Sequence, residues 1–296
     1  MVDLFATSAE QGLVLCLVTL GIVISFRIAD FPDLTVDGSF ATGASVAAVG
    51  LVAGLPPLLA VGIAAVAGAA AGTATGILHT KLGISKILAG ILMMIMLYSV
   101  NLRIMGRSNV PLLDVRTALT PLENVNWAHS AAFIIAFGVL ALAARGVLDW
   151  FFSTDLGLAL RAVGDNERMA VAAGVNPDSA KILALAMANC LVGLSGALFA
   201  QTVGFADVGM GIGMIIIGFA SLLIGEAVFG RRSIARLTAA AVTGTIIYQL
   251  IVGTALRLGL APTDLRLATG LMVVAALGLS RRAAQRRAGA EAGTAA

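Results

Sequence analysis

Long apolar runs constrain the fold of this chain more than any other feature. Nine such runs alternate with short polar segments, at 11–29, 40–53, 55–79, 86–105, 128–152, 179–204, 209–229, 234–253 and 265–280. A helix needs about 20 mostly apolar residues to cross a bilayer. Only 12% of the 296 residues are charged, against about a quarter in soluble domains, which excludes a soluble enzyme. We therefore predict an all-α polytopic membrane helical bundle of about 8–10 transmembrane spans.

The second run, 40–53, is too short to cross a membrane alone, and Pro32 and Gly38 interrupt the polar stretch before it. Broken helices of this kind line solute sites in transporters. We expect one broken or re-entrant segment here, close to the translocation path. The alternative is an ordinary interfacial loop in which Asp37 or Ser39 caps the next helix. The residues of this stretch that we expect along the path are Phe31, Thr35, Asp37 and Ser39.

The positions of the basic residues predict the orientation. Cytoplasmic loops of membrane proteins carry an excess of Lys and Arg, and four arginines follow the last run at 281–287. With the C-terminus in the cytoplasm, nine alternating spans place fourteen of the 19 basic residues inside and the N-terminus outside. The loop 153–181 is then cytoplasmic and the loop 106–127 is external. Residues 1–285 form a single transmembrane permease domain in this interpretation, and 286–296 form a short cytoplasmic tail.

A row of small residues recurs every fourth position in the third run. The row consists of Ala60, Ala64, Gly68, Gly72 and Gly76. In lipid, where packing drives helix association, such a row lets two backbones approach closely. We expect a tight helix–helix contact along this face.

The predicted cytoplasmic loop 153–181 reads as two short helices, 156–163 and 166–173, separated by Gly164 and Asp165. Asp165 is a good N-cap for the second helix, and Gly174 is a good C-terminal stop. A helix of about eight residues is marginal alone in water, so it must dock on something. The alternatives are another protein and the chain's own membrane domain. The residues that we expect to contact a partner are Asp165, Asn166, Glu167, Arg168, Met169, Ala170, Ala173 and Gly174.

Three further polar residues lie inside apolar runs. Tyr98 and Asn101 are close together near the end of the fourth run, where they line a polar path or hydrogen-bond neighbouring helices. Glu226 precedes Arg231 and Arg232 by five and six residues. An acid inside a membrane span is a functional hypothesis by default, so we expect Glu226 along the translocation path as well. The alternative is an ion pair or a water-exposed carboxylate near the cytoplasmic end.

The sequence contains no pattern typical of a catalytic or cofactor site. The glycine-rich phosphate loop that ends in Lys-Ser or Lys-Thr is missing, so this chain has no motif for binding ATP. Its cysteines and histidines have no metal-ligand spacing. The basic residues lie in short loops rather than in a patch for nucleic acid. We predict a non-catalytic chain that binds no cofactor, metal or nucleic acid and contacts membrane lipid.

Several of these segments together resemble a known family. The stretch 157–176, followed by Lys181, is similar to the cytoplasmic coupling loop of bacterial ABC-importer permeases of the branched-chain amino acid and ribose type. Segments 33–39, 82–91 and 222–230 are similar to further stretches of that family. The resemblance extends from about residue 12 to residue 280.

The resemblance implies a permease subunit that forms the path for a small polar solute in the bacterial inner membrane. Its implied partners are ABC ATPase subunits, which carry ATP and Mg, a second permease copy in a homodimer, and an extracytoplasmic substrate-binding protein. Segment 101–106 resembles a branch with amino-acid-type cargo. The alternatives are a nucleoside or sugar ABC permease and a self-contained secondary transporter or channel. The lack of paired acids within the spans disfavours the latter.

Overall fold

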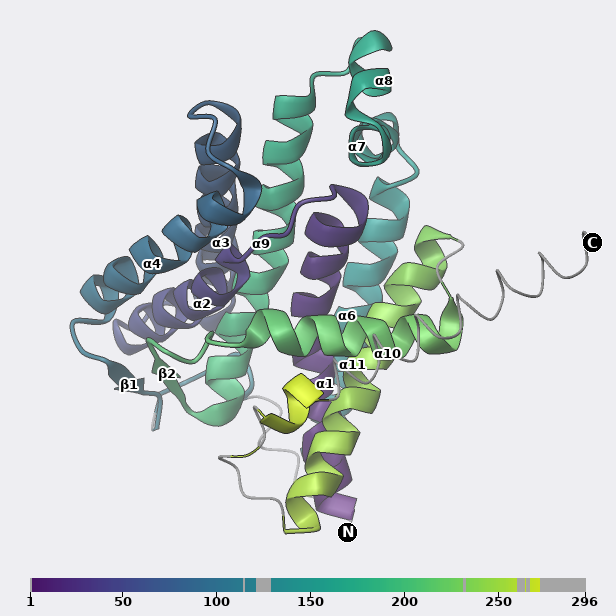
Figure 1. The fold of residues 1–296 in the computed structure, drawn as a ribbon. Helices are drawn as coiled ribbons and strands as arrows, with labels where there is room; N and C mark the ends of the chain where they lie inside the picture. The colour runs from purple at the N-terminus through teal and green to yellow at the C-terminus, as the bar shows by residue number, and fades with distance from the viewer. Residues whose placement is uncertain are drawn as a thin grey trace, which may run out of the picture.

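The computed structural model describes residues 2–113, 115–120, 129–230, 233–259, 264 and 267–271, and it shows a helical bundle with one short two-stranded ribbon (Figure 1). The elements before the loop 153–181 are α1 (Val2–Ile22), the π-helical turn η1 (Val23–Ile28), α2 (Thr35–Val52), α3 (Pro57–Thr80), α4 (Lys86–Met105), β1 (Asn109–Pro111) and α6 (His129–Phe151). The remaining elements are α7 (Asp155–Asp165), α8 (Glu167–Ala172), α9 (Pro177–Val203), β2 (Phe205–Asp207), α10 (Met214–Phe229) and α11 (Ile234–Arg257).

The bundle has two distinct ends. Helices α7 and α8 project from one end, and α1 begins at the opposite end (Figure 1). Ion pairs join three segments at the α7–α8 end: Lys81 with Asp178, Lys86 with Asp30, and Lys181 with Glu167. Strands β1 and β2, which follow α4 and α9, pair antiparallel away from this end. The loops therefore separate into two groups as the alternating spans require, while the membrane side of each group stays a prediction.

The described residues include seven helices long and apolar enough to cross a membrane, so the polytopic bundle is confirmed. Two predicted spans need correction. The second is not a half-length span, because α2 is a continuous 18-residue helix that contains Gly38. The interruption is confined to residues 29–34. The run 209–229 is instead divided into turns and the 16-residue helix α10, which lies crosswise to α1 and α9 (Figure 1). Most of the predicted span 265–280 and the tail 286–296 lie outside the described residues.

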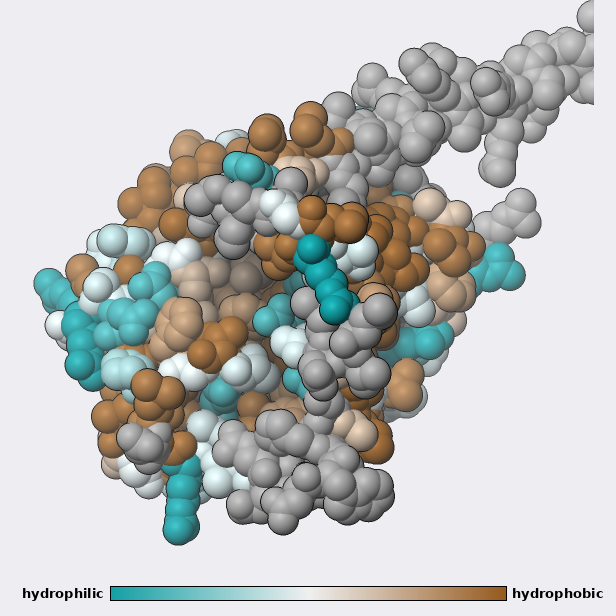
Figure 2. Space-filling view, turned by 90° about the horizontal axis from the view of Figure 1, so that it is seen from below, coloured by the Kyte–Doolittle hydropathy of each residue, from teal (hydrophilic) through white to brown (hydrophobic). Residues whose placement is uncertain are grey.

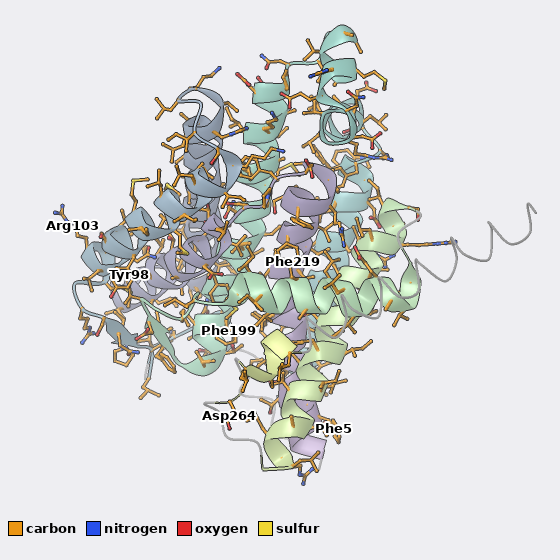
Figure 3. The ribbon with its side chains drawn as sticks, in the orientation of Figure 1. Phe5, Tyr98, Arg103, Phe199, Phe219 and Asp264 are labelled. Carbon is orange, nitrogen blue, oxygen red and sulfur yellow. The ribbon has the colours of Figure 1, made fainter. Side chains whose placement is uncertain are left out.

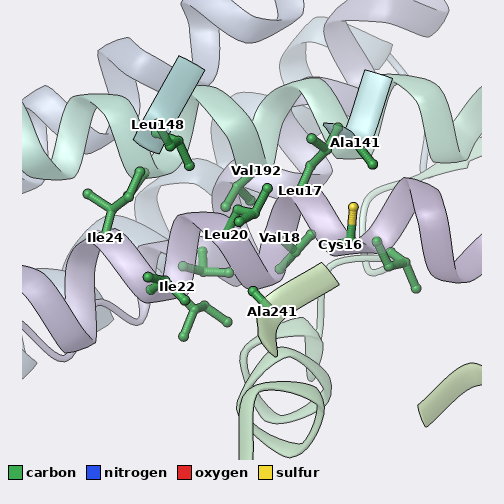
Figure 4. Close-up of a cluster of buried hydrophobic side chains, with 14 of the residues drawn as sticks. Cys16, Leu17, Val18, Leu20, Ile22, Ile24, Ala141, Leu148, Val192 and Ala241 are labelled. Carbon is green, nitrogen blue, oxygen red and sulfur yellow. The ribbon is translucent and has the colours of Figure 1, made fainter. Parts of the chain in front are cut away.

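Helix α1 forms the centre of the bundle. It is apolar on every side and packs against α6, α9, α10 and α11, as expected for a helix buried within a large protein. Figure 4 shows Leu17, Leu20 and Val18 of α1 among side chains of these neighbours, including Leu148 of α6 and Val192 of α9. In the peripheral helices α4 and α6, most apolar side chains are instead exposed or only partly buried, as a lipid-facing surface requires. Seen from the end where α1 begins, hydrophobic residues cover broad areas of the surface (Figure 2).

The predicted small-residue contact is confirmed, and its partner is α9. The whole row on α3 is buried against that helix. A Cβ atom on Gly68 would overlap the carbonyl oxygen of Asn189, and one on Gly72 would overlap that of Leu185. Gly43 of α2 makes an equally close approach to Gly193 of α9. Three helix backbones therefore meet with no side chain between them.

Helix α10 begins beside α2, because Asp37 caps it across the fold. The N-cap residue Gly213 has no side chain, and its φ is 93°. Asp37 accepts hydrogen bonds from the backbone N–H of Gly213 at Oδ2 and of Ile215 at Oδ1, both at 2.9 Å. A carboxylate there also interacts favourably with the positive end of the helix dipole. The expectation that Asp37 or Ser39 caps the following helix is wrong: the cap acts on α10.

The α3–α9 contact predicts how two glycines of α3, one buried and one exposed, respond to substitution by alanine. Gly72→Ala places a methyl group against the Leu185 carbonyl and should lower the free energy of unfolding by about 1–3 kcal/mol, the usual cost of overpacking. Gly62→Ala, on an exposed face of the same helix with open space around it, should be neutral or stabilising. Thermal unfolding of the detergent-solubilised chain measures both. Equal melting temperatures for the two variants would contradict the close contact.

The Asp37 cap generates a second prediction. Asp37→Ala removes both acceptors and should cost about 0.5–2 kcal/mol of stability, as for other N-caps. Asp37→Asn keeps one acceptor and replaces the other with an NH2 group, which cannot accept a hydrogen bond, so its stability should lie between those of the wild type and of Asp37→Ala. Thermal unfolding distinguishes the two variants. Equal unfolding temperatures for Asp37→Ala and the wild type would contradict a stabilising cap.

Candidate translocation path and coupling loop

The linker 29–34 is held in the bundle by a buried carboxylate. Asp33 is 2% exposed and accepts hydrogen bonds from the Thr35 backbone N–H at 2.9 Å and from Asn189 Nδ2 of α9 at 2.6 Å. The hydroxyl oxygens of Thr35 and Thr75 of α3 lie 2.7 Å apart. Burial raises the pKa of Asp33, and the hydrogen bonds from Thr35 and Asn189 oppose that shift. The linker is therefore fixed to α9 and α3.

Two predicted path residues have buried polar atoms without a partner. Ser39 of α2 and Asn101 of α4 are both 0% exposed. Asn101 Nδ2 lies 3.5 Å from the Gly38 carbonyl, whereas Asn101 Oδ1 and Ser39 Oγ have no hydrogen-bond partner among the described residues. Unsatisfied buried polar atoms are rare and need an explanation. These unpartnered atoms on α2 and α4 favour a polar path through this part of the bundle, which stays a prediction.

The other predicted path residues are distributed over separate contacts. Phe31 is fully buried, and its ring makes an edge contact with His79 at 5.2 Å between centroids. Tyr98 is half exposed on α4, at the edge of the view where Arg103 also projects (Figure 3). The carboxylate of Asp37 is occupied by the cap on α10. Among the predicted path residues, the structure thus brings Asn101 of α4 to the Gly38 carbonyl of α2 and places the others in separate contacts.

Glu226 forms a buried ion pair with a residue that sequence reasoning did not identify. Its carboxylate lies 2.7 Å from both Nε and Nη2 of Arg27, in η1, and its side chain is 3% exposed. The expected partners, Arg231 and Arg232, lie outside the described residues. Arg27 could have been identified as a candidate partner, because it is the single basic residue at the end of the first apolar run. The contact between Asp33 and Asn189 was harder to predict, because each is an isolated polar residue in the sequence.

The loop 153–181 contains the two predicted short helices, but their caps differ from the prediction. Asp165 is the last residue of α7, and Asn166 is the N-cap of α8 through a hydrogen bond from the Met169 backbone N–H to Oδ1 at 3.1 Å. Gly174 follows α8 with a φ of 84°, as expected for a helix stop. Glu167 is paired with the nearly buried Lys181 of α9 at 2.8 Å. Internal contacts therefore hold α8 on the bundle.

The surface of α8 remains apolar and exposed where it faces away from the bundle. Met169 is 64% exposed and Val171 is 52% exposed, and Arg168 and Ala173 are also exposed. Ala170 faces inward and is buried. Large apolar side chains on a segment outside the membrane helices are typical of a docking surface. Of the predicted coupling residues, Asn166, Glu167 and Ala170 hold the loop itself in place.

The described residues contain no group of three His, Cys, Asp or Glu side chains placed to hold a metal ion. Several of the polar groups described above bind neighbouring helices, whereas Ser39 Oγ, Asn101 Oδ1 and Asn189 Oδ1 have no hydrogen-bond partner among the described residues. The arrangement is therefore a set of helix–helix contacts, a polar interface and a projecting loop.

Comparisons with known proteins agree with these features. The family model described as "Branched-chain amino acid transport system / permease component" matches residues 4–277. A "Tyrosine transport system permease protein" of Clostridioides difficile (strain R20291) is 43% identical over 267 residues, which are 90% of this chain and 88% of that protein. An uncharacterized protein of Rickettsia prowazekii (strain Madrid E) is 33% identical over 285 residues, which are 95% of this chain and 99% of that protein. No solved structure matches the chain. The chain belongs to the family of permease components of branched-chain amino acid transport systems.

Proposed function

We propose that this chain is the membrane-spanning subunit of an ATP-driven ABC importer and forms the path for an amino acid or an amino-acid-like solute. The single observation that carries this proposal is the α7–α8 loop. It is fixed to the bundle by the Lys181–Glu167 ion pair and presents Met169 and Val171 to a partner. A rigid loop with an exposed apolar surface transmits force from a docked protein better than a flexible loop does.

The partner that fits this surface is an ABC ATPase subunit, which supplies the ATP and Mg that the chain has no motif to bind. The projecting helices offer a small apolar ridge suited to a groove, and Arg168 beside it supplies a charge that sets register. We further assign a second copy of this chain, in a homodimer, and an extracytoplasmic substrate-binding protein as partners. The site of action is the bacterial inner membrane.

The substrate class rests on the relatives and on the polar atoms of the interior. A relative with 43% identity is named as a tyrosine transport permease. Two buried polar atoms without a partner among the described residues, the hydroxyl oxygen of Ser39 on α2 and the amide oxygen of Asn101 on α4, are available to a polar solute. These groups also suit the hydroxyls of a nucleoside or a sugar, which is the second candidate class.

A self-contained secondary transporter is less consistent with the geometry. Such a protein needs acidic residues in its spans that bind and release a coupling ion or proton. Here Asp37 caps α10, and Glu226 is paired with Arg27. Both acids therefore have a structural role in the folded bundle. We infer that the energy for transport comes from a separate ATPase subunit rather than from an ion or proton bound by these acids.

The orientation is tested by labelling single cysteines in intact cells with a membrane-impermeant reagent added outside. Ser108→Cys, exposed next to β1, should react, and Asp165→Cys, exposed at the end of α7, should react only after the cells are opened. The physical reason is the excess of basic residues at the α7–α8 side. Reaction of Asp165→Cys in intact cells would reverse the orientation.

The importer proposal is tested by co-purification with the candidate ATPase and by tyrosine uptake through the reconstituted complex. Ala173→Trp adds bulk to the exposed end of α8 without filling the core and should lower both ATPase recovery and uptake at least tenfold, equivalent to about 1.4 kcal/mol of lost binding.

Two variants serve as controls for Ala173→Trp. Ser108→Trp places the same side chain at the opposite end and should leave ATPase recovery unchanged. Ala170→Trp fills a buried position and should destabilise the loop itself. Wild-type recovery and uptake with Ala173→Trp would mean that α8 is not the docking element.

A further inference from the structure

The end of α1 departs from regular helix geometry at η1. The six residues Val23–Ile28 form a π-helical turn, and the Phe31 N–H then donates to the Ser25 carbonyl at 2.8 Å. Asp30 follows with a φ of 49°, the one non-glycine residue with positive φ in the described chain. π-Turns inside α-helices occur frequently at functional sites, where they allow a local change of register. This turn is therefore the place where α1 can deform at the least cost.

Helix α7 touches η1 directly. Gly164 lies so close to the Ile28 carbonyl oxygen that a Cβ atom on it would overlap that oxygen. The buried side of α7, which includes Leu160 and Val163, faces the bundle near this contact. No side chain separates the two backbones at Gly164. A displacement of α7 towards the bundle should therefore displace η1 directly, because no side chain between them can change rotamer to absorb it.

Helix α10 is attached to the same turn by charge and by aromatic contact. Arg27 and Glu226 meet with two N···O distances of 2.7 Å, and their side chains are 22% and 3% exposed. Next to them, the rings of Phe26 and Phe219 make an edge contact with 4.5 Å between centroids. Separation of this pair would leave an uncompensated charge on the buried side chain of Glu226, which is strongly unfavourable. Helix α10 should therefore move together with η1.

The far side of α10 connects to two further helices. A Cβ atom on Gly225 would overlap the Ala240 carbonyl of α11, and Asp37 of α2 caps the first turn of α10. A shift of α10 should thus displace α11 and the α2 residues next to Ser39. One continuous series of contacts leads from α7 through η1 to α10 and on to α2.

We propose that the Arg27–Glu226 ion pair on η1 transmits displacement of α7 to α10, so that both are positioning residues for transport. This inference rests on the importer function proposed above, because it assigns a route from the loop that docks the ATPase to the path. The two residues contact neither solute nor ATP. Their role is to make α10 follow η1.

The first test uses the full-length chain alone in lipid nanodiscs and measures amide hydrogen exchange of α10. Gly164→Ala displaces η1 and should raise α10 exchange by about tenfold, within the range of coupling found in shared ion-pair networks. In a Glu226→Gln background, adding Gly164→Ala should produce no further rise. Gly157→Ala is the matched control, because its Cβ would meet Phe151 and Phe152 rather than η1.

Two results of this test would overturn the inference. One is an equal rise in α10 exchange with and without Glu226. The other is the same rise in α10 exchange with Gly157→Ala as with Gly164→Ala. Both measurements use the chain without the ATPase. They therefore test the contact between α7, η1 and α10 independently of the proposed importer function.

The second test uses the reconstituted complex with the ATPase. Glu226→Gln should retain ATPase association and ATP hydrolysis, while tyrosine taken up per ATP hydrolysed falls at least tenfold. Exchange of the two charges, Arg27→Glu with Glu226→Arg, should restore part of that ratio, which also controls for misfolding of the single variant. Uptake per ATP at the wild-type level in Glu226→Gln would disprove the role. Failure of the wild-type chain to bind the ATPase would instead disprove the importer function.

Discussion

The close approach of the α2, α3 and α9 backbones is the constraint on which the rest of the structure depends. Lipid tails are as apolar as leucine, so no hydrophobic force presses membrane helices together, and association relies on packing and hydrogen bonds. Gly68 and Gly72 allow α3 to lie on α9, and Gly193 does the same for α2. Because these three helices are fixed, Asn189 of α9 is in place to hold Asp33 and thereby the linker 29–34.

Several polar groups within this scaffold act between helices that are distant in sequence. Asp37 is separated from the turn that it caps by about 176 residues, and Arg27 from Glu226 by 199. In a low-dielectric interior, each such contact is strong when satisfied and costly when broken. Polar residues in the spans therefore determine which helices move together. Ser39 and Asn101 depart from this pattern, since each keeps an atom without a partner in the described chain.

The sequence predicted the features that depend on local pattern and missed those that depend on tertiary contact. Apolar length identified the helices, and four-residue spacing identified the buried face of α3, because both are properties of one helix. Hydropathy did not separate the turns at 209–213 from α10, since they lie in one apolar run. Caps were assigned one residue wrong at Asp165 and to the wrong helix at Asp37, because several nearby side chains qualify and only the fold selects among them.

The docking role proposed for the α7–α8 loop makes two demands that usually conflict. A docking surface must expose apolar side chains, whereas a lever must not yield when force is applied to it. Here Asn166 caps α8 and Glu167 binds Lys181 at the start of α9, so the helix has a fixed base despite its six residues. Met169 and Val171 are left for a partner. Helix α9 carries both Lys181 and the glycine contacts of the core, so α8 is joined directly to the closely packed helices α2, α3 and α9, whereas α7 contacts the π-helical turn η1.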